Sequence, residues 1–151
     1  MRVTTKGRYA LRAITNLALA NSEKPIPIKH IAGDEDLSPE FLEQIFFRLK
    51  KTGIISSVRG PGGGFMLDRA PEDISVKDIF DAVGEGLEIT PCTGADGCKR
   101  AENCVIRDVW EEASQMIVNH FAGLTLRQVM DMSKSKSPVI ENMMSGKEFN
   151  V

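Results

Sequence analysis

The chain has 151 residues, of which 42% are apolar, so it can form one or two small domains with an ordinary core. No run approaches the roughly 20 apolar residues of a membrane span, and polar residues interrupt the N-terminal apolar segment, so we expect neither a membrane protein nor a signal peptide. The net charge of -2 is unevenly spread: residues 1–70 carry 11 Lys and Arg against 7 Asp and Glu, or +4, and residues 71–151 carry 8 against 14, or -6. A basic front half can bind phosphate, although solvated helix charges would explain part of it.

Three helices are predicted in the basic half. Small and apolar residues at helical spacing indicate one over 5–21 and a short one over 28–33. The third begins with Ser38 as N-cap and Pro39 at its first position, and Gly53 is expected to end it as a C-cap. Its buried stripe is expected to consist of Leu42, Ile45, Phe46 and Leu49.

Two short β-rich runs follow, on either side of the basic tip RGPGGG at 59–64. They predict a hairpin. Three helices followed by a hairpin form the winged helix-turn-helix plan, in which the third helix enters the major groove and the wing lies along the backbone or the minor groove. We therefore predict a mainly α protein with a small β-hairpin wing, whose residues 1–85 bind double-stranded DNA.

The outward face of the third helix is expected to read bases. Glu43 would accept from cytosine N4, Gln44 would pair with adenine and Phe47 would touch a thymine methyl, although solvation or packing explains each of them equally well. Basic residues of the first and third helices would hold phosphate. The complete predicted set is Arg2, Lys6, Arg8, Ser38, Glu40, Phe41, Glu43, Gln44, Phe47, Arg48, Lys51, Arg59, Gly60, Pro61, Gly62 and Gly63.

The acidic half contains three further predicted helices. Ser75 caps the first, with Asp78 completing a capping box. A long helix is expected from about 103 to 121, and its apolar stripe is broad enough to pair with its own copy in a two-fold dimer. His120 lies on this stripe as a core or interface residue. A shorter helix over 124–132 completes the dimerisation segment, 105–132, and a flexible tail is expected over 133–151.

All three cysteines, Cys92, Cys98 and Cys104, lie in the segment 86–104, with five residues between neighbours. We expect a cytoplasmic protein, in which thiols stay reduced, so metal or redox chemistry is favoured over a disulfide. Thiolates so close in sequence can converge on one soft metal centre. Iron-sulfur binding, a structural zinc site in a constitutive DNA-binding protein, and metal-free thiol sensing all remain open on this pattern.

No enzymatic signature accompanies these features. The sequence has neither a phosphate-binding loop in a strand-to-helix unit nor a serine elbow, and its two histidines, His30 and His120, have plausible structural roles. We therefore expect a protein that is not an enzyme.

Several segments together resemble a known family over roughly residues 1–130: MRVTTKGRYALRA, SPEFLEQIFFRLKKTGIISSVRGPGGGF, and three cysteines followed by DVW. They are similar to the IscR-type iron-sulfur cluster regulators, in a winged-helix repressor family that also contains the nitric-oxide sensor NsrR. The resemblance implies a bacterial homodimeric transcription factor, expected to be a repressor. Its cysteines would hold a 2Fe-2S or 4Fe-4S cluster delivered by iron-sulfur assembly proteins, with nitric oxide or thiol oxidation as alternative signals.

The chain departs from this family at the fourth cluster ligand. IscR proteins typically have a histidine three residues after the last cysteine, where this chain has Arg107. NsrR-type sensors use an aspartate near the N-terminus of the partner subunit, where this chain has Arg8. Asp108, an acid of the partner chain, a small molecule or Arg107 itself are the candidates left to complete the site.

Overall fold

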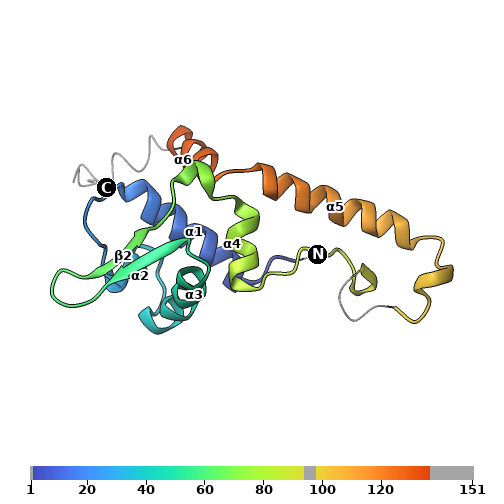
Figure 1. The fold of residues 1–151 in the computed structure, drawn as a ribbon, viewed down its shortest axis with the longest axis horizontal. Coiled ribbons are helices and arrows are strands. Elements are labelled where there is room, and N and C mark those ends of the chain that lie inside the picture. The colour runs from blue at the N-terminus through green and yellow to red at the C-terminus, as the bar shows by residue number, and fades with distance from the viewer. Residues whose placement is uncertain (1, 94–97, 137–151) are drawn as a thin grey trace, which may run out of the picture.

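The computed structural model describes residues 2–93 and 98–136 (Figure 1). These residues are mainly helical, with one two-stranded antiparallel sheet, which confirms the predicted fold class. No helix within them is long and apolar enough to cross a membrane. The elements in chain order are α1 (Thr5–Ala20), α2 (Ile28–Asp34), α3 (Pro39–Lys51), β1 (Ile55–Val58), β2 (Gly64–Leu67), α4 (Val76–Val83), α5 (Arg107–Gly123) and α6 (Leu126–Ser135), with 3-10 turns at Pro71–Asp73, Pro91–Thr93 and Ala101–Asn103.

The main core lies among the first three helices, the wing, α4 and α6, which contributes Leu126 and Met130. The stripe predicted for α3 is buried in full: Leu42, Ile45, Phe46 and Leu49 are all inaccessible to solvent. Burial of a side chain of this size stabilises the fold by about 1.5–3 kcal/mol. Phe46 also meets Phe65 of β2 edge to face, with ring centroids 5.0 Å apart. Helix α3 and the wing are therefore fixed to one another through a shared core.

Side-chain caps set the ends of α3 and α4. Ser38 Oγ accepts from the Phe41 amide at 3.2 Å, and Ser75 and Asp78 form the predicted capping box. The C-terminal end of α3 differs from its prediction, because Thr52 occupies the C-cap. Gly53 follows it with φ 76°, and its amide donates to the Lys50 carbonyl at 3.0 Å, so the glycine ends the helix from the position after the cap.

The wing is the hairpin of β1 and β2, with Ile55 opposite Leu67 and Val58 opposite Gly64. Close to its turn, β2 is joined to the segment before α2: the Ile26 amide donates to the Phe65 carbonyl at 3.0 Å, and the Phe65 amide donates back at 2.9 Å. A Cβ on Gly64 would collide with the Ile26 carbonyl, so this close approach needs glycine. The hairpin is thereby anchored close to its turn, at the first residues of β2.

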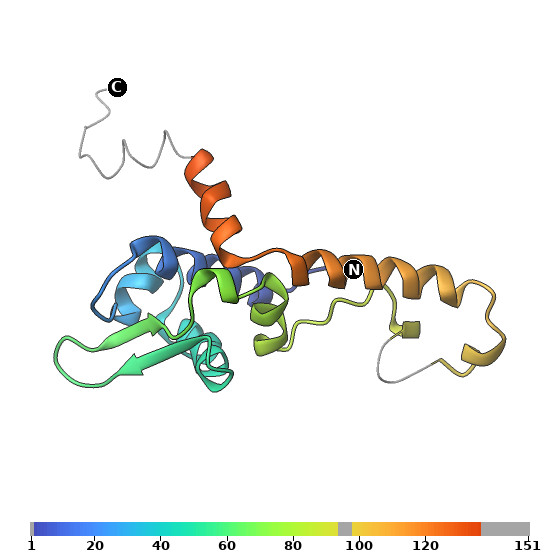
Figure 2. The same ribbon diagram turned by 45° about the horizontal axis from the view of Figure 1, so that its top comes forward.

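The second half of the chain extends away from the wing. Val76 and Phe80 of α4 form a small second core with Leu87, against which Phe121 of α5 packs, and the Phe80 and Phe121 ring centroids are 5.3 Å apart. From this contact α5 runs along the long axis of the molecule. The wing tip and the cysteine segment consequently lie at opposite ends of the chain's fold (Figures 1 and 2).

Two helix boundaries differ from the sequence prediction. The long helix starts at Arg107 rather than near 103, because residues Ala101–Asn103 form a separate 3-10 turn and Cys104 is extended, with φ -90° and ψ 106°. The last helix starts at Leu126, where Thr125 and Gln128 form a capping box, and continues to Ser135, into the predicted tail. The rest of that tail, 137–151, lies outside the described residues.

Candidate nucleic-acid interface and cysteine site

The face of α3 opposite its buried stripe is open to solvent. Glu43, Gln44, Phe47 and Arg48 are all exposed, and Phe47 is 68% accessible. Phe47 adds an apolar aromatic side chain to this otherwise polar face. These side chains are therefore free to contact a partner on this face.

The predicted phosphate-binding cations are not neutralised by the protein. Arg2, Arg8, Lys51 and Arg59 are exposed, and no ion pair involves any of them in the part of the chain that the structure describes. None of the ion pairs among the described residues involves the exposed Arg48 or the partly buried Lys6 either. By contrast Arg12, which was not among the predicted contacts, binds Glu35 with its Nε 2.8 Å from Oε2. Positive charge on this half of the molecule remains available to phosphate.

The carboxyl group of Glu35 is buried beneath that ion pair. Burial raises the pKa of Glu35 above its usual value of 4.5, while the Arg12 charge and a hydrogen bond donated by Asn16 act in the opposite direction. Arg12 also lies over the Tyr9 ring, 5.5 Å from its centroid. Arg12 thus links α1 to the residue that follows α2, although its own side chain is mostly exposed.

Two of the predicted contact residues are engaged inside the domain. The Ser38 hydroxyl accepts the capping hydrogen bond at the start of α3. Phe41 is half-buried and meets Tyr9 of α1 edge to face, at a centroid distance of 6.1 Å. Their structural role is to fix where α3 begins relative to α1.

The wing tip presents a compact turn. The Gly63 amide donates to the Gly60 carbonyl at 2.9 Å, and Arg59, Gly60, Pro61 and Gly62 are all exposed. With few side chains in the way, a phosphate backbone can come close to this turn. Arg59 is the cation that the turn carries to it.

Glu85, which the sequence analysis missed, anchors the first turn of α1. Its side chain is 6% exposed, and its carboxylate accepts from the Thr4 amide at 2.8 Å and from the Thr4 hydroxyl. A Cβ on Gly7 would lie only 2.8 Å from Glu85 Cδ, so the glycine makes room for the carboxyl group. A lone acid just after a helix carries no sequence signal for such a contact, which spans 81 positions of the chain.

The three cysteines line one small pocket. Cys92 lies in the turn Pro91–Thr93, Cys98 follows the undescribed residues 94–97, and Cys104 comes after the turn Ala101–Asn103. All three thiols are free and half-buried. The pocket has a volume of about 40 Å³ and is lined by Cys92, Cys98, Ala101, Cys104, Ile106, Arg107 and Trp110.

The two candidates for a fourth ligand on this chain are placed differently. Arg107 lines the pocket, and its Nε is buried with no hydrogen-bond partner among the described residues; the nearest acid, Glu111, has Oε2 3.9 Å away. Asp108 is exposed and does not line the pocket. Within the described residues, no three His, Cys, Asp or Glu side chains are close enough to hold a single metal ion.

The segment leading to the cysteines is attached to the rest of the fold by two hydrogen-bonded contacts, in addition to the packing of Leu87 in the second core. Glu85 binds Thr4, and the Ile89 amide donates to Ser114 Oγ at 3.1 Å. Ser114 is the one fully buried residue of α5, all of which is described. A displacement of the cysteine segment would therefore act on both α5 and the start of α1.

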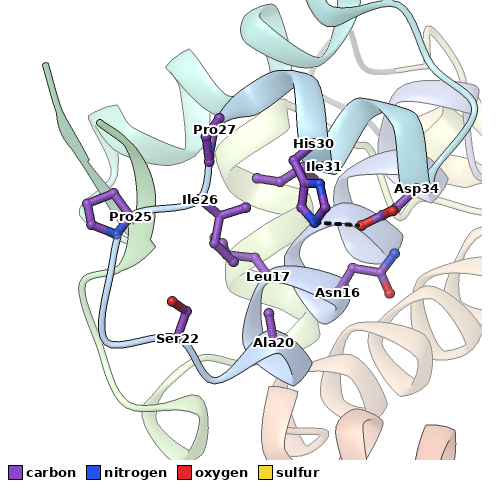
Figure 3. A pocket seen from close by; sticks show the side chains of 10 residues that line it. All are labelled: Asn16, Leu17, Ala20, Ser22, Pro25, Ile26, Pro27, His30, Ile31 and Asp34. Carbon is purple, nitrogen blue, oxygen red and sulfur yellow. Dashed lines mark ion pairs between the residues drawn. The ribbon is translucent and has the colours of Figure 1, made fainter. Parts of the chain in front are cut away.

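A larger pocket, of about 480 Å³, lies between α1 and α2, remote from the cysteines. Its wall is mostly apolar, with His30 facing Asp34 at an Nε2 to Oδ2 distance of 3.9 Å (Figure 3). None of the predicted DNA-binding residues or cysteines lines it. This pocket therefore belongs to neither candidate site.

Comparison with known proteins agrees with these features. The model of the Rrf2 family, described as an iron-dependent transcriptional regulator, matches residues 3–132. The HTH-type transcriptional regulator IscR of Erwinia tasmaniensis is 39% identical over 131 residues, covering 87% of this chain and 79% of the relative. The IscR of Pectobacterium carotovorum is 35% identical over 153 residues, covering 97% and 93%.

Two solved structures share the fold. T. potens IscR matches with a TM-score of 0.73, 31% identity and 91% coverage of both chains. CymR of B. subtilis, described as the global cysteine regulator, matches with a TM-score of 0.72, 27% identity, and coverage of 87% of this chain and 98% of that one. The chain therefore belongs to the Rrf2 family and is an IscR-like DNA-binding transcriptional regulator rather than an enzyme.

Proposed function

We propose that the protein is a homodimeric repressor that senses iron-sulfur status through Cys92, Cys98 and Cys104. The observation that carries the proposal is the convergence of these thiols on one pocket at the start of α5. Three sulfur donors in a largely apolar wall are the type of ligand that binds an iron-sulfur cluster. Iron-sulfur assembly proteins would deliver the cluster. Residues 86–104 would hold the cluster, which supplies reversible one-electron and ligand-exchange chemistry when bound.

The dimer would form through α5 and α6, over residues 105–132. Ile106 and Val109 are each 56% exposed, and Met116 is 68% exposed, so the apolar side of α5 is largely uncovered in one chain. Apolar surface of this extent is typical of an interface between subunits. A two-fold dimer would place two α3 helices on the same side of a DNA duplex, for two half-sites about one turn apart.

On DNA, residues 1–85 would make the contacts. The exposed face of α3 would enter the major groove, where Glu43, Gln44 and Phe47 meet base edges. Cations of α1 and α3 would fix the register on the phosphates, and Arg59 would bring the wing to the backbone or the minor groove.

Signalling would rest on a shift of the described part of the cysteine segment relative to α1 and α5. The pocket of about 40 Å³ has room for only a few water molecules, so binding of a cluster would have to widen it and shift the residues that line it. That shift would act on α5 through Ile89 and Ser114, and on α1 through Glu85 and Thr4. DNA affinity would change only as far as loading favours one arrangement over the other.

The test is to measure iron and acid-labile sulfide per chain, with a visible spectrum, on protein purified without oxygen. We expect comparable iron and sulfide and a chromophore that Cys92→Ala abolishes. In DNA-binding assays, Cys92→Ala should retain some affinity and lose discrimination between promoters. Zinc in place of iron would instead indicate a structural site, and absence of metal would indicate a thiol-based sensor; either result would refute the cluster proposal and leave the DNA-binding assignment intact.

A further inference from the structure

We infer that Arg107 serves the cysteine pocket as a cationic hydrogen-bond donor to sulfur, which tunes the reduction potential of the site, and not as its fourth ligand. This inference rests on the proposed function, since it concerns the same pocket. Its starting point is the buried Nε of Arg107, which lines the pocket and has no hydrogen-bond partner among the described residues.

The surroundings of this nitrogen define the acceptor that it lacks. The rest of the described pocket wall consists of three cysteine sulfurs and the side chains of Ala101, Ile106 and Trp110. Glu111 approaches only to 3.9 Å, which is too long for a hydrogen bond, and its side chain is mostly exposed. A buried donor without a partner is unfavourable, so an acceptor inside the pocket would satisfy it. Thiolate or sulfide sulfur is the acceptor that the wall of the pocket favours.

The chemistry of the guanidinium group excludes coordination. It carries five N–H donors and no acceptor, and it stays protonated at any pH at which a protein is folded. Arg107 cannot therefore replace a neutral histidine as a metal ligand. Its positive charge would instead stabilise the more negative, reduced form of the sulfur-ligated iron, and this raises the reduction potential.

The experiment is a redox titration of the anaerobically loaded wild-type protein and of three variants, followed in the visible spectrum. Arg107→Gln removes the charge and leaves a neutral amide donor in place of Nε, whereas Arg107→Lys keeps the charge and moves the donor one atom further from the backbone. Arg100→Gln is the matched control, because Arg100 is an exposed cation of the same segment that does not line the pocket. Iron and sulfide content is measured for each variant before the titration.

We expect Arg107→Gln to lower the equilibrium constant for one-electron reduction at least tenfold, which is a fall of about 59 mV. Arg107→Lys should recover more than half of that change, and Arg100→Gln should leave the potential near that of the wild type. Loss of cluster from Arg107→Gln, with retention in Arg107→Lys, would also support a role for the charge.

Other results would overturn the inference in distinguishable ways. Equal potentials in loaded wild-type and Arg107→Gln protein would refute the role of Arg107 and leave the cluster in place. Loss of cluster from both Arg107 variants would show that the shape of arginine, and not its charge, is needed. Wild-type protein without iron and sulfide would refute the proposed function itself.

Discussion

The contact between Gly7 and Glu85 gives a sharp energetic prediction. The Glu85 carboxylate is almost fully buried and accepts two hydrogen bonds from Thr4, and a Cβ at position 7 would occupy its space. Hydrogen bonds to a charged group contribute about 1.5–3 kcal/mol each, whereas Gly to Ala within a helix gains at most about 1 kcal/mol. Gly7→Ala should therefore destabilise the fold by about 2–4 kcal/mol, although alanine is the better helix former.

A double-mutant cycle isolates this contact. Glu85→Ala alone should cost a similar amount, because Thr4 loses its partner, but it also vacates the space that the methyl group of Gly7→Ala needs. The double variant should then be no less stable than Glu85→Ala, which corresponds to a coupling energy of about 2 kcal/mol or more. Urea unfolding of the four proteins at one pH measures it. Additivity within about 0.5 kcal/mol would refute the steric reasoning.

Three further variants test other parts of the molecule. Arg59→Ala should weaken DNA binding and reduce the slope of log affinity against log salt by about 0.9 per bound protomer, with unchanged iron content; an unchanged slope would remove the wing from the interface. Met116→Glu puts a charge on the exposed apolar side of α5 and should shift the protein from dimer to monomer in sedimentation. Gln115→Glu is the control, because it puts the same charge on the exposed neighbouring residue and should leave the dimer intact. Glu35→Gln should change the pH dependence of stability: because the folded-state pKa of Glu35 is raised above 4.5, its favourable contribution is complete below that pH and is lost as pH rises through the raised value. The stability of the wild type relative to Glu35→Gln should accordingly fall above pH 4.5 in urea titrations, and a rising difference would contradict the assigned environment.

Local signals predicted the DNA-binding half well. Ser38, Pro39 and the stripe from Leu42 to Leu49 define α3 because caps and apolar spacing act within one or two turns of the chain. The same is true of the capping box of Ser75 and Asp78. The glycines at the wing tip likewise indicated a turn, since their backbone freedom is a local property.

The cysteine half was less accessible to such reasoning. Apolar periodicity extended the long helix back to about 103, whereas the chain breaks at Cys104, whose extended backbone lets the thiol line the pocket. The buried positions of Glu85 and of the Arg107 Nε depend on contacts or on packing that periodicity does not encode. Dimer formation and the fourth ligand remain predictions, since they depend on groups beyond a single chain.

The position of the single tryptophan gives the molecule an optical reporter at the cysteine pocket. The chain has one tryptophan and one tyrosine. Trp110 is part of the wall around the cysteines, whereas Tyr9 packs against Phe41 at the start of α3. Fluorescence excited selectively in the indole therefore reports on events among the thiols, without a contribution from the phenol. Unlabelled protein can thus be used to time those events against DNA binding that is followed by a separate signal.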